Sequence, residues 1–388
     1  MKRLLSIILP AVYLASSWTW VIGMWFPVYL VADFGWPGWV AFAVPNVIGA
    51  AAMGWVLRRS GAAERIVREH PRATWWFSVI TIGFHASVLA WVLALVCANV
   101  SWLGQGYYGP LMASVLVAAS LVLARVPYRG MLVGAVVVYG LSLMFAALAF
   151  GYTDGAVFEW PRRTGTSSGV DLLCIVPVLV FGFALCPYLD LTFLRVRRET
   201  PGSAGTAAFV VGFGVLFLAM IVLSLLYASR FGAGRFNLWL LGHMVGQSVF
   251  TMAVHFREQW LVRAQRDADG AAVERSPFVL TPVLALVIVA GLACGPLPFI
   301  RPELNLERTA YEAFMSCYGL TFPAFVWIVM LARGMSARVR LATWAGAVAV
   351  GLPLLWFGWT GRAYWMVPLA IVAAVAAPFV GRAFSRRG

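Results

Sequence analysis

The chain has 388 residues, of which 62% are hydrophobic and 11% charged, and its formal net charge is +14. A composition this apolar excludes an ordinary soluble globular protein and indicates a polytopic membrane protein. The basic excess does not by itself indicate nucleic-acid binding, because the positions of basic residues along the chain decide what they contact.

The N-terminal sequence MKRLLSIILPAVYLASS resembles a secretory signal peptide, with a basic start, an apolar run and small residues. The apolar run continues through residues 18–31, however, with no polar region after the possible cleavage site. We therefore predict that this segment is retained as the first membrane span.

Twelve apolar segments follow one another along the chain, each near the length needed to cross a hydrocarbon core of roughly 30 Å. The expected spans are 4–32, 37–57, 74–98, 109–124, 130–151, 171–194, 206–228, 237–259, 277–298, 309–332, 340–359 and 363–382. The five cysteines fall inside apolar runs without metal-type spacing, so we expect them to be small core residues.

The basic residues alternate between the two sides of this topology. With the N-terminus inside, the inner segments hold 22 of the 29 Lys and Arg residues, and the outer loops hold seven. This is the positive-inside distribution, so the charge reports membrane topology and no nucleic-acid partner is expected. We predict a multi-pass protein of the inner membrane with both termini in the cytoplasm.

Two spans carry signs of a break. The first has the polar sequence SSWT at residues 16–19, and the sixth has Gly182 and Pro187 near its middle and Asp190 just beyond. Unpaired backbone groups are costly in hydrocarbon, so such breaks are tolerated where they line a cavity or lie within protein. The spacing of five spans predicts an inverted repeat, with residues 1–151 and 171–332 as its halves and 338–388 as two additional helices.

The two breaks are expected to face each other. We predict that the sixth span is unwound near Phe181–Pro187 and faces the first span near Ser17–Val21. A half-helix beginning near Pro187 would point its positive end at the cavity, with Asp190 one turn inside it. The alternative is a proline-kinked packing helix whose Asp190 reaches the cytoplasmic arginines.

Two stretches resemble a known transporter fold. IGMWFPVYLVADFGWPGWVAFAVPNVIGAAAMGWVL, residues 22–57, is similar to the first two helices of the leucine-transporter-like fold. FGFALCPYLDLTFLRVRRETP, residues 181–201, resembles the sixth helix of the amino acid–polyamine–organocation superfamily. The first break differs, because SSWTW stands where that superfamily has paired glycines. The resemblance implies that spans one, three, six, eight and ten surround a central site.

The candidate site residues lie near mid-depth of those spans. The substrate-binding candidates are Ser17, Thr19, Trp20, His85, Phe181, Gly182, Phe183, Tyr188, Asp190, Gln247 and Tyr318. Ser248 and Thr251 share one helix face and are candidate sodium ligands through their hydroxyl oxygens. Small and polar residues also serve helix packing in membranes, so a packing role stays open for His85, Ser248 and Thr251.

The sequence favours an all-α polytopic secondary transporter, a symporter or permease, that moves a small organic solute by alternating access. His85 and Asp190 favour a proton as coupling ion and the two hydroxyls favour sodium; no other cofactor is expected. The aromatic residues at the breaks favour a solute with an apolar or cationic face. The alternatives are a transporter-derived sensor or scaffold and a membrane enzyme, and the oligomeric state is open. The loop RRSGAAERIVREHPR lacks the motif typical of major-facilitator transporters.

The topology can be tested with reporters. A reporter fused after Arg266 should be cytoplasmic, and one inserted near Thr166 should be external, because the charge distribution orients these loops oppositely. The location is measured by a pair of enzyme and fluorescence reporters active on opposite sides. Finding both insertions on the same side would rule out the twelve-span topology.

Overall fold

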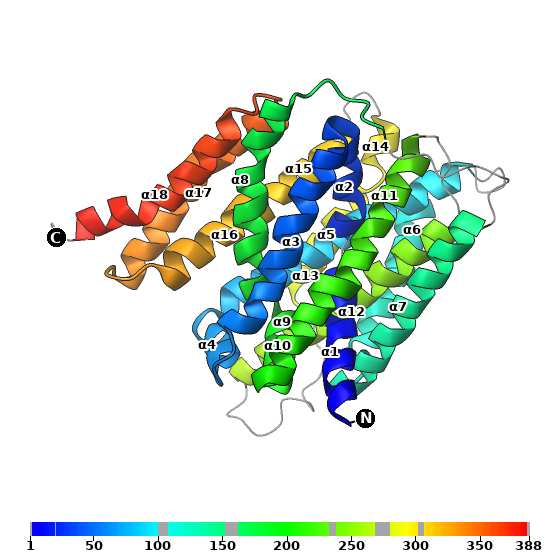
Figure 1. Cartoon of the computed structure of the whole chain (residues 1–388), viewed down its shortest axis with the longest axis horizontal. Coiled ribbons are helices and arrows are strands. Elements are labelled where there is room, and N and C mark those ends of the chain that lie inside the picture. Colours follow the sequence, from blue (N-terminus) through cyan, green and yellow to red (C-terminus); the bar gives the residue numbers. More distant parts are fainter. Residues whose placement is uncertain are drawn as a thin grey trace.

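The computed structural model describes residues 2–19, 21–99, 108–151, 162–232, 238–267, 280–301 and 306–385. All regular elements in these ranges are helices, which form a bundle with the N-terminus at one end (Figure 1). Each of the twelve expected spans corresponds to one of these elements or to a broken set of them.

The first half contains α1 (Lys2–Trp18) and α2 (Val21–Phe34), which together make the first span. It continues with α3 (Trp36–Val56), the short α4 (Ala62–Glu69), α5 (Pro71–Asn99), α6 (Tyr108–Leu123) and α7 (Tyr128–Gly151). The sixth span is divided into α8 (Gly169–Leu185), η1 (Cys186–Leu189) and α9 (Leu191–Glu199).

The seventh span contains a π-helical segment, in the order α10 (Gly202–Val211), η2 (Gly212–Phe217) and α11 (Leu218–Gly232). The next elements are α12 (Leu238–Asp267), α13 (Pro282–Cys294) and the short α14 (Leu297–Ile300). The tenth span runs through α15 (Leu306–Ser316), η5 (Cys317–Thr321), α16 (Phe322–Ala324) and η6 (Phe325–Leu331), and α17 (Ala337–Trp359) and α18 (Met366–Ser385) end the described chain.

Length and apolarity support most of the expected spans. Among the described residues, eight helices are long and apolar enough to cross a membrane, or nine if the bent pair α1 and α2 is one span. Of the remaining three expected spans, α6 and α13 are apolar but have only 16 and 13 residues. The third, α12, has 30 residues and carries many polar side chains.

The broken spans lie in the centre of the bundle. Every residue described between Pro10 and Val28 is buried, so the first span is covered on all sides. By contrast, only 22% of the apolar window of α17 is buried, against 67% for α5. α17 and α18 pack on each other at one side of the bundle, in orange and red in Figure 1. They therefore flank the central helices and do not form part of the centre.

Glycines allow close contacts between the helices around the centre. A Cβ atom added at Gly49 in α3 would overlap the backbone of Phe183 in α8. A Cβ atom at Gly182 would lie 2.8 Å from the carbonyl oxygen of Tyr318 in η5. Small residues have this function where backbones approach closely in membrane proteins. Gly182 thus brings α8 and η5 together.

Substituting Gly49→Ala should destabilise the fold by about 1–3 kcal/mol, because the methyl group meets backbone atoms that cannot easily move. Gly140→Ala in α7 is the matched control, because a Cβ atom there meets nothing within 4 Å. Thermal unfolding of the two purified variants in detergent measures the difference. Equal melting temperatures would contradict the close approach of α3 and α8.

Candidate functional site

The first break lies at the centre of the bundle. α1 ends at Trp18 and α2 begins at Val21, and the two axes differ by 58°. The hydroxyls of Ser17 and Thr19 donate to the carbonyls of Leu14 and Ala15, at 3.2 and 2.7 Å. These short side chains therefore form hydrogen bonds with backbone carbonyls near the end of α1. The candidate Trp20 lies outside the described residues.

His85 satisfies a backbone N–H that the first break exposes, and Tyr311 contacts the same residue. The Val21 N–H donates to His85 Nε2 at 3.4 Å, while the Tyr311 hydroxyl donates to the Val21 carbonyl at 3.3 Å. His85 Nδ1 lies 2.8 Å from the carbonyl of Thr81, so it donates there and leaves Nε2 as the acceptor. This arrangement fits a neutral imidazole, and it places the candidate His85 directly at the break.

The second break is one helical turn later than expected. The helix continues through Phe181–Leu185, a single 3₁₀ turn covers Cys186–Leu189, and Asp190 has extended backbone with φ −75° and ψ 112°. Pro187 lies in the first turn of the 3₁₀ segment, where its missing N–H costs no hydrogen bond. The expected unwinding near Phe181–Pro187 and the half-helix beginning near Pro187 therefore need correction.

Asp190 is the N-cap of α9, at the start of that helix and not one turn inside it. Its Oδ1 accepts from both the backbone N–H and the hydroxyl of Thr192, each at 2.7 Å. The Thr192 hydroxyl also lies 3.3 Å from Ser17 Oγ. One buried contact therefore joins the second break to the first, with a carboxylate placed where a helix N-terminus stabilises it.

The second oxygen of Asp190 faces α12. Asp190 Oδ2 lies 4.0 Å from His255 Nε2, and His255 Nδ1 lies 3.0 Å from the hydroxyl of Ser78 in α5. All three side chains are fully buried. Sequence reasoning missed His255 as a site residue. Its spacing of four and seven residues from Thr251 and Ser248 puts it on their helix face and could have revealed it.

Of the two candidate sodium ligands, Thr251 contacts the end of α1. Thr251 Oγ1 donates to the Ser16 carbonyl at 3.5 Å, and Ser248 is fully buried. Gln247 points elsewhere, because its Nε2 donates to Ser142 of α7 at 2.8 Å. Within the described ranges, no three or more His, Cys, Asp or Glu side chains are grouped to hold a metal ion. The hydroxyl and carbonyl oxygens are thus the relevant groups for a hard cation.

Aromatic side chains enclose the site from the tenth span. The Tyr318 hydroxyl hydrogen-bonds the hydroxyl of Thr81, and its ring packs against Phe77 and Phe314 with centroids 4.9 and 4.5 Å apart. Phe183 instead packs on Phe42 of α3, at 5.1 Å. The remaining candidates Phe181 and Tyr188 are buried and half-buried respectively.

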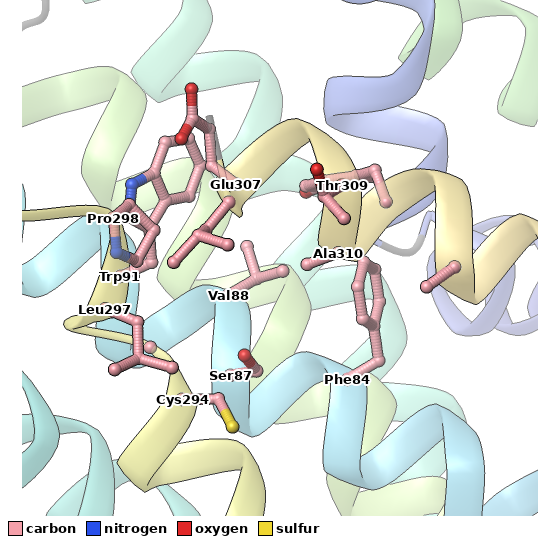
Figure 2. Close-up of a pocket in the computed structure, with 14 residues that line it drawn as sticks. Phe84, Ser87, Val88, Trp91, Cys294, Leu297, Pro298, Glu307, Thr309 and Ala310 are labelled. Atoms are coloured by element: carbon pink, nitrogen blue, oxygen red, sulfur yellow. The ribbon is translucent and has the colours of Figure 1, made fainter. Parts of the chain in front are cut away.

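An apolar pocket of about 230 Å³ lies between α5, α14 and α15. Figure 2 shows Phe84 and Val88 of α5 near Thr309 and Ala310 of α15. Phe84 and Tyr311 both line the pocket, and the Tyr311 hydroxyl reaches the first break. Tyr311 therefore links the pocket to the first break.

An ion-pair cluster closes the end of the bundle away from the N-terminus. Arg308 Nη1 donates to Asp33 Oδ1 at 3.1 Å, and its Nε donates to Glu312 Oε1 at 2.9 Å. Arg362, from the loop between α17 and α18, lies 3.7 Å from Asp33 and 3.4 Å from Glu312. The cluster therefore joins the first span, the tenth span and the C-terminal pair.

A second cluster lies at the other end, between α9 and α12. Glu258 is fully buried, and its carboxylate is 3.9 Å from Arg195 and 3.6 Å from Arg198. Arg195 also contacts Glu199 at 3.3 Å. A buried carboxylate needs such cationic partners, so α9 and α12 are held together at this end.

No protein-family model and no curated protein sequence matches the chain. A solved structure of MHP1, a nucleobase-cation-symport-1 family transporter in a closed conformation with bromovinylhydantoin bound, aligns over 98% of this chain and 92% of its own, with a TM-score of 0.50. The chain is similar in fold to this transporter. The sequence identity is 13%, so the similarity concerns the fold alone.

A second structure, of the inward-facing conformation of Mhp1, covers 98% of this chain and 90% of its own at 14% identity and a TM-score of 0.47. The MHP1 structure in the closed conformation confirms the fold class expected from the sequence, an all-helical polytopic membrane protein of the leucine-transporter-like type.

Proposed function

We propose that the protein is a secondary transporter that moves a small organic solute across the membrane by alternating access. The observation that carries this proposal is the meeting of two broken, buried spans through Ser17, Thr192 and Asp190. A membrane protein that only needed stability would avoid two such breaks, because each exposes backbone groups that require polar partners. The division into residues 1–151, 171–332 and 338–388 is part of the same proposal.

The two ion-pair clusters are the proposed gates. Opening toward the end that carries Asp33 would separate it from Arg308, and opening toward the N-terminal end would separate Glu258 from Arg195 and Arg198. Because the central side chains are fully buried with both clusters formed, the structure corresponds to a closed form. We propose that the N-terminal end faces the cytoplasm, as the positive-inside distribution predicts.

The solute is proposed to bind beside the two breaks, against Tyr318 and His85. Aromatic rings there favour a planar, apolar or cationic group, and the exposed backbone of Val21 offers hydrogen bonds once His85 or Tyr311 moves. Bromovinylhydantoin is bound in the similar MHP1 structure. A first panel of solutes should therefore contain hydantoins and nucleobases beside amino acids and amines.

The coupling ion has two proposed sites. Sodium would use the hydroxyls of Ser248 and Thr251 with the carbonyl of Ser16. A proton would be shared by Asp190 and His255, which lie 4.0 Å apart in a fully buried environment. The two sites lie on one face of α12. Binding of either ion would therefore depend on the distance between α12 and the broken spans.

Substituting Asp190→Asn should lower solute uptake at least about tenfold, the effect of losing a charged hydrogen bond. The fold should survive, because asparagine caps a helix about as well as aspartate. Uptake of the solute panel into proteoliposomes is the measurement. Asp171→Asn, in the capping box of α8 outside the site, is the control and should transport normally. Normal uptake by Asp190→Asn would contradict the site, and no uptake by the intact wild-type protein would favour a non-transporting sensor or scaffold.

The coupling ion can be identified by applying one gradient at a time. If sodium drives uptake, Ser248→Ala should weaken that dependence about tenfold, and His255→Gln should have little effect on it. If a pH gradient drives uptake, the two variants should behave in the opposite way. Uptake that is equal in sodium and choline buffers and insensitive to pH would contradict both ion sites.

A further inference from the structure

A large groove on the side of the bundle has no part in the central site. It lies between the beginning of α5, the π-helical part of the tenth span and α17, and its volume is about 1070 Å³. Trp76 and Ile80 of α5, Phe325 and Val329 of η6, and Trp344 of α17 line its length. The α17 residues that line it are exposed or half-buried, so the groove opens on the outer surface of the bundle.

Basic residues collect at one end of this groove. Arg68 of α4, Arg72 of α5 and Arg340 of α17 line the mouth, with Glu69 as the one carboxylate among the lining residues and His70 beside it. Arg68 and Arg72 are exposed. Three arginines from three separate elements thus lie at one opening. Their guanidinium groups can donate hydrogen bonds to one anionic group from different sides.

Arg340 is held at the mouth of the groove by the tenth span. Its Nη1 donates to the carbonyl of Val329 at 2.9 Å, which holds the side chain in place. Its Nε is buried and has no hydrogen-bond partner among the residues that the structure describes. The guanidinium group is thus positioned at the mouth by the tenth span, and its charge can attract an anionic group there.

The rest of the groove is lined mainly by apolar side chains, and its length can hold part of an acyl chain. From Arg72 to Ile80 the groove follows α5 for roughly 12 Å, at 1.5 Å per residue. Trp76 is 43% exposed, and the rings of Phe325 and Trp344 pack with centroids 5.6 Å apart. Tryptophan is typical of the boundary between lipid headgroups and hydrocarbon. The charged mouth and apolar length therefore match the two parts of a phospholipid.

We propose that this groove is a binding site for an anionic phospholipid of the surrounding bilayer, with its phosphate between Arg72 and Arg340 and an acyl chain along α5 and η6. Basic pockets between membrane helices bind such headgroups, and each arginine near a membrane surface favours anionic lipid. A free phosphate would occupy only the mouth and leave the apolar wall uncovered. The proposal does not depend on transport.

The lipid would also contact the span that reaches the central site. Cys317 lines the inner end of the groove, and the next residue, Tyr318, hydrogen-bonds Thr81 at the centre. The Trp344 indole donates to the Thr321 carbonyl at 3.0 Å, beside the same π-helical turn. An acyl chain in the groove would therefore brace the part of the tenth span that carries Tyr318.

Native mass spectrometry of the full-length protein in detergent tests the site, with phosphatidylglycerol, phosphatidylcholine and glycerol phosphate as probes. Phosphatidylglycerol should bind more tightly than the other two. Arg72→Gln should weaken it about fivefold, and Arg72→Gln with Arg340→Gln by the square of that factor. Arg72 is exposed, so the single variant is expected to fold even if loss of the Arg340–Val329 bond destabilises the double variant.

Arg125→Gln is the matched control, because Arg125 is an exposed arginine of the loop between α6 and α7, outside the groove. It should leave lipid binding unchanged. Equal binding of phosphatidylglycerol and phosphatidylcholine to the wild-type protein would overturn the proposal. An Arg125→Gln loss as large as that of Arg72→Gln would overturn it too, since unspecific surface charge would then explain the binding. Tight binding of glycerol phosphate alone would reduce the site to an anion site without an acyl groove.

Discussion

The arrangement of the central helices depends on one constraint: backbone groups released at a helix break must find polar partners inside an apolar bundle. At the sixth span, Asp190 and Thr192 meet this requirement by capping α9. Thr192 then extends the same hydrogen-bonded group to Ser17 of the first span. A break in one helix is thus stabilised by the break in another, which explains why both lie at the same buried level.

The spans and their order could be predicted from the sequence, because apolar length and charge placement are properties of single segments. The position of the sixth-span break could not. Gly182 and Pro187 both signal a break, yet the contact that uses Gly182 is with Tyr318, far away in the sequence. Pro187 is the second residue of the 3₁₀ turn, directly after the end of α8. Which role a glycine has depends on the neighbour that reaches it, and one sequence does not contain that information.

The polar residues of α12 also show what a single sequence cannot predict. Ser248 and Thr251 could be recognised as one face of a helix, but His255 extends that face only if α9 places a carboxylate opposite it. The helix periodicity predicts the face and cannot predict its partner. Polar side chains also lower the hydropathy of α12. This helix, which carries buried polar groups near the breaks, is therefore not among the eight described helices that are long and apolar enough to cross a membrane.

Arg362 joins the C-terminal pair of helices to the first and tenth spans. Its backbone is left-handed, with φ 60°, an uncommon conformation for a residue other than glycine. From there its guanidinium lies near the carboxylates that Arg308 binds. If α2 and α15 separate as proposed, Arg362 must lose at least one of these two contacts. In the proposed transport cycle, the contacts of this loop would contribute to the free-energy difference between closed and open populations. Sequence changes in the loop would then alter how often the protein opens without changing the central residues.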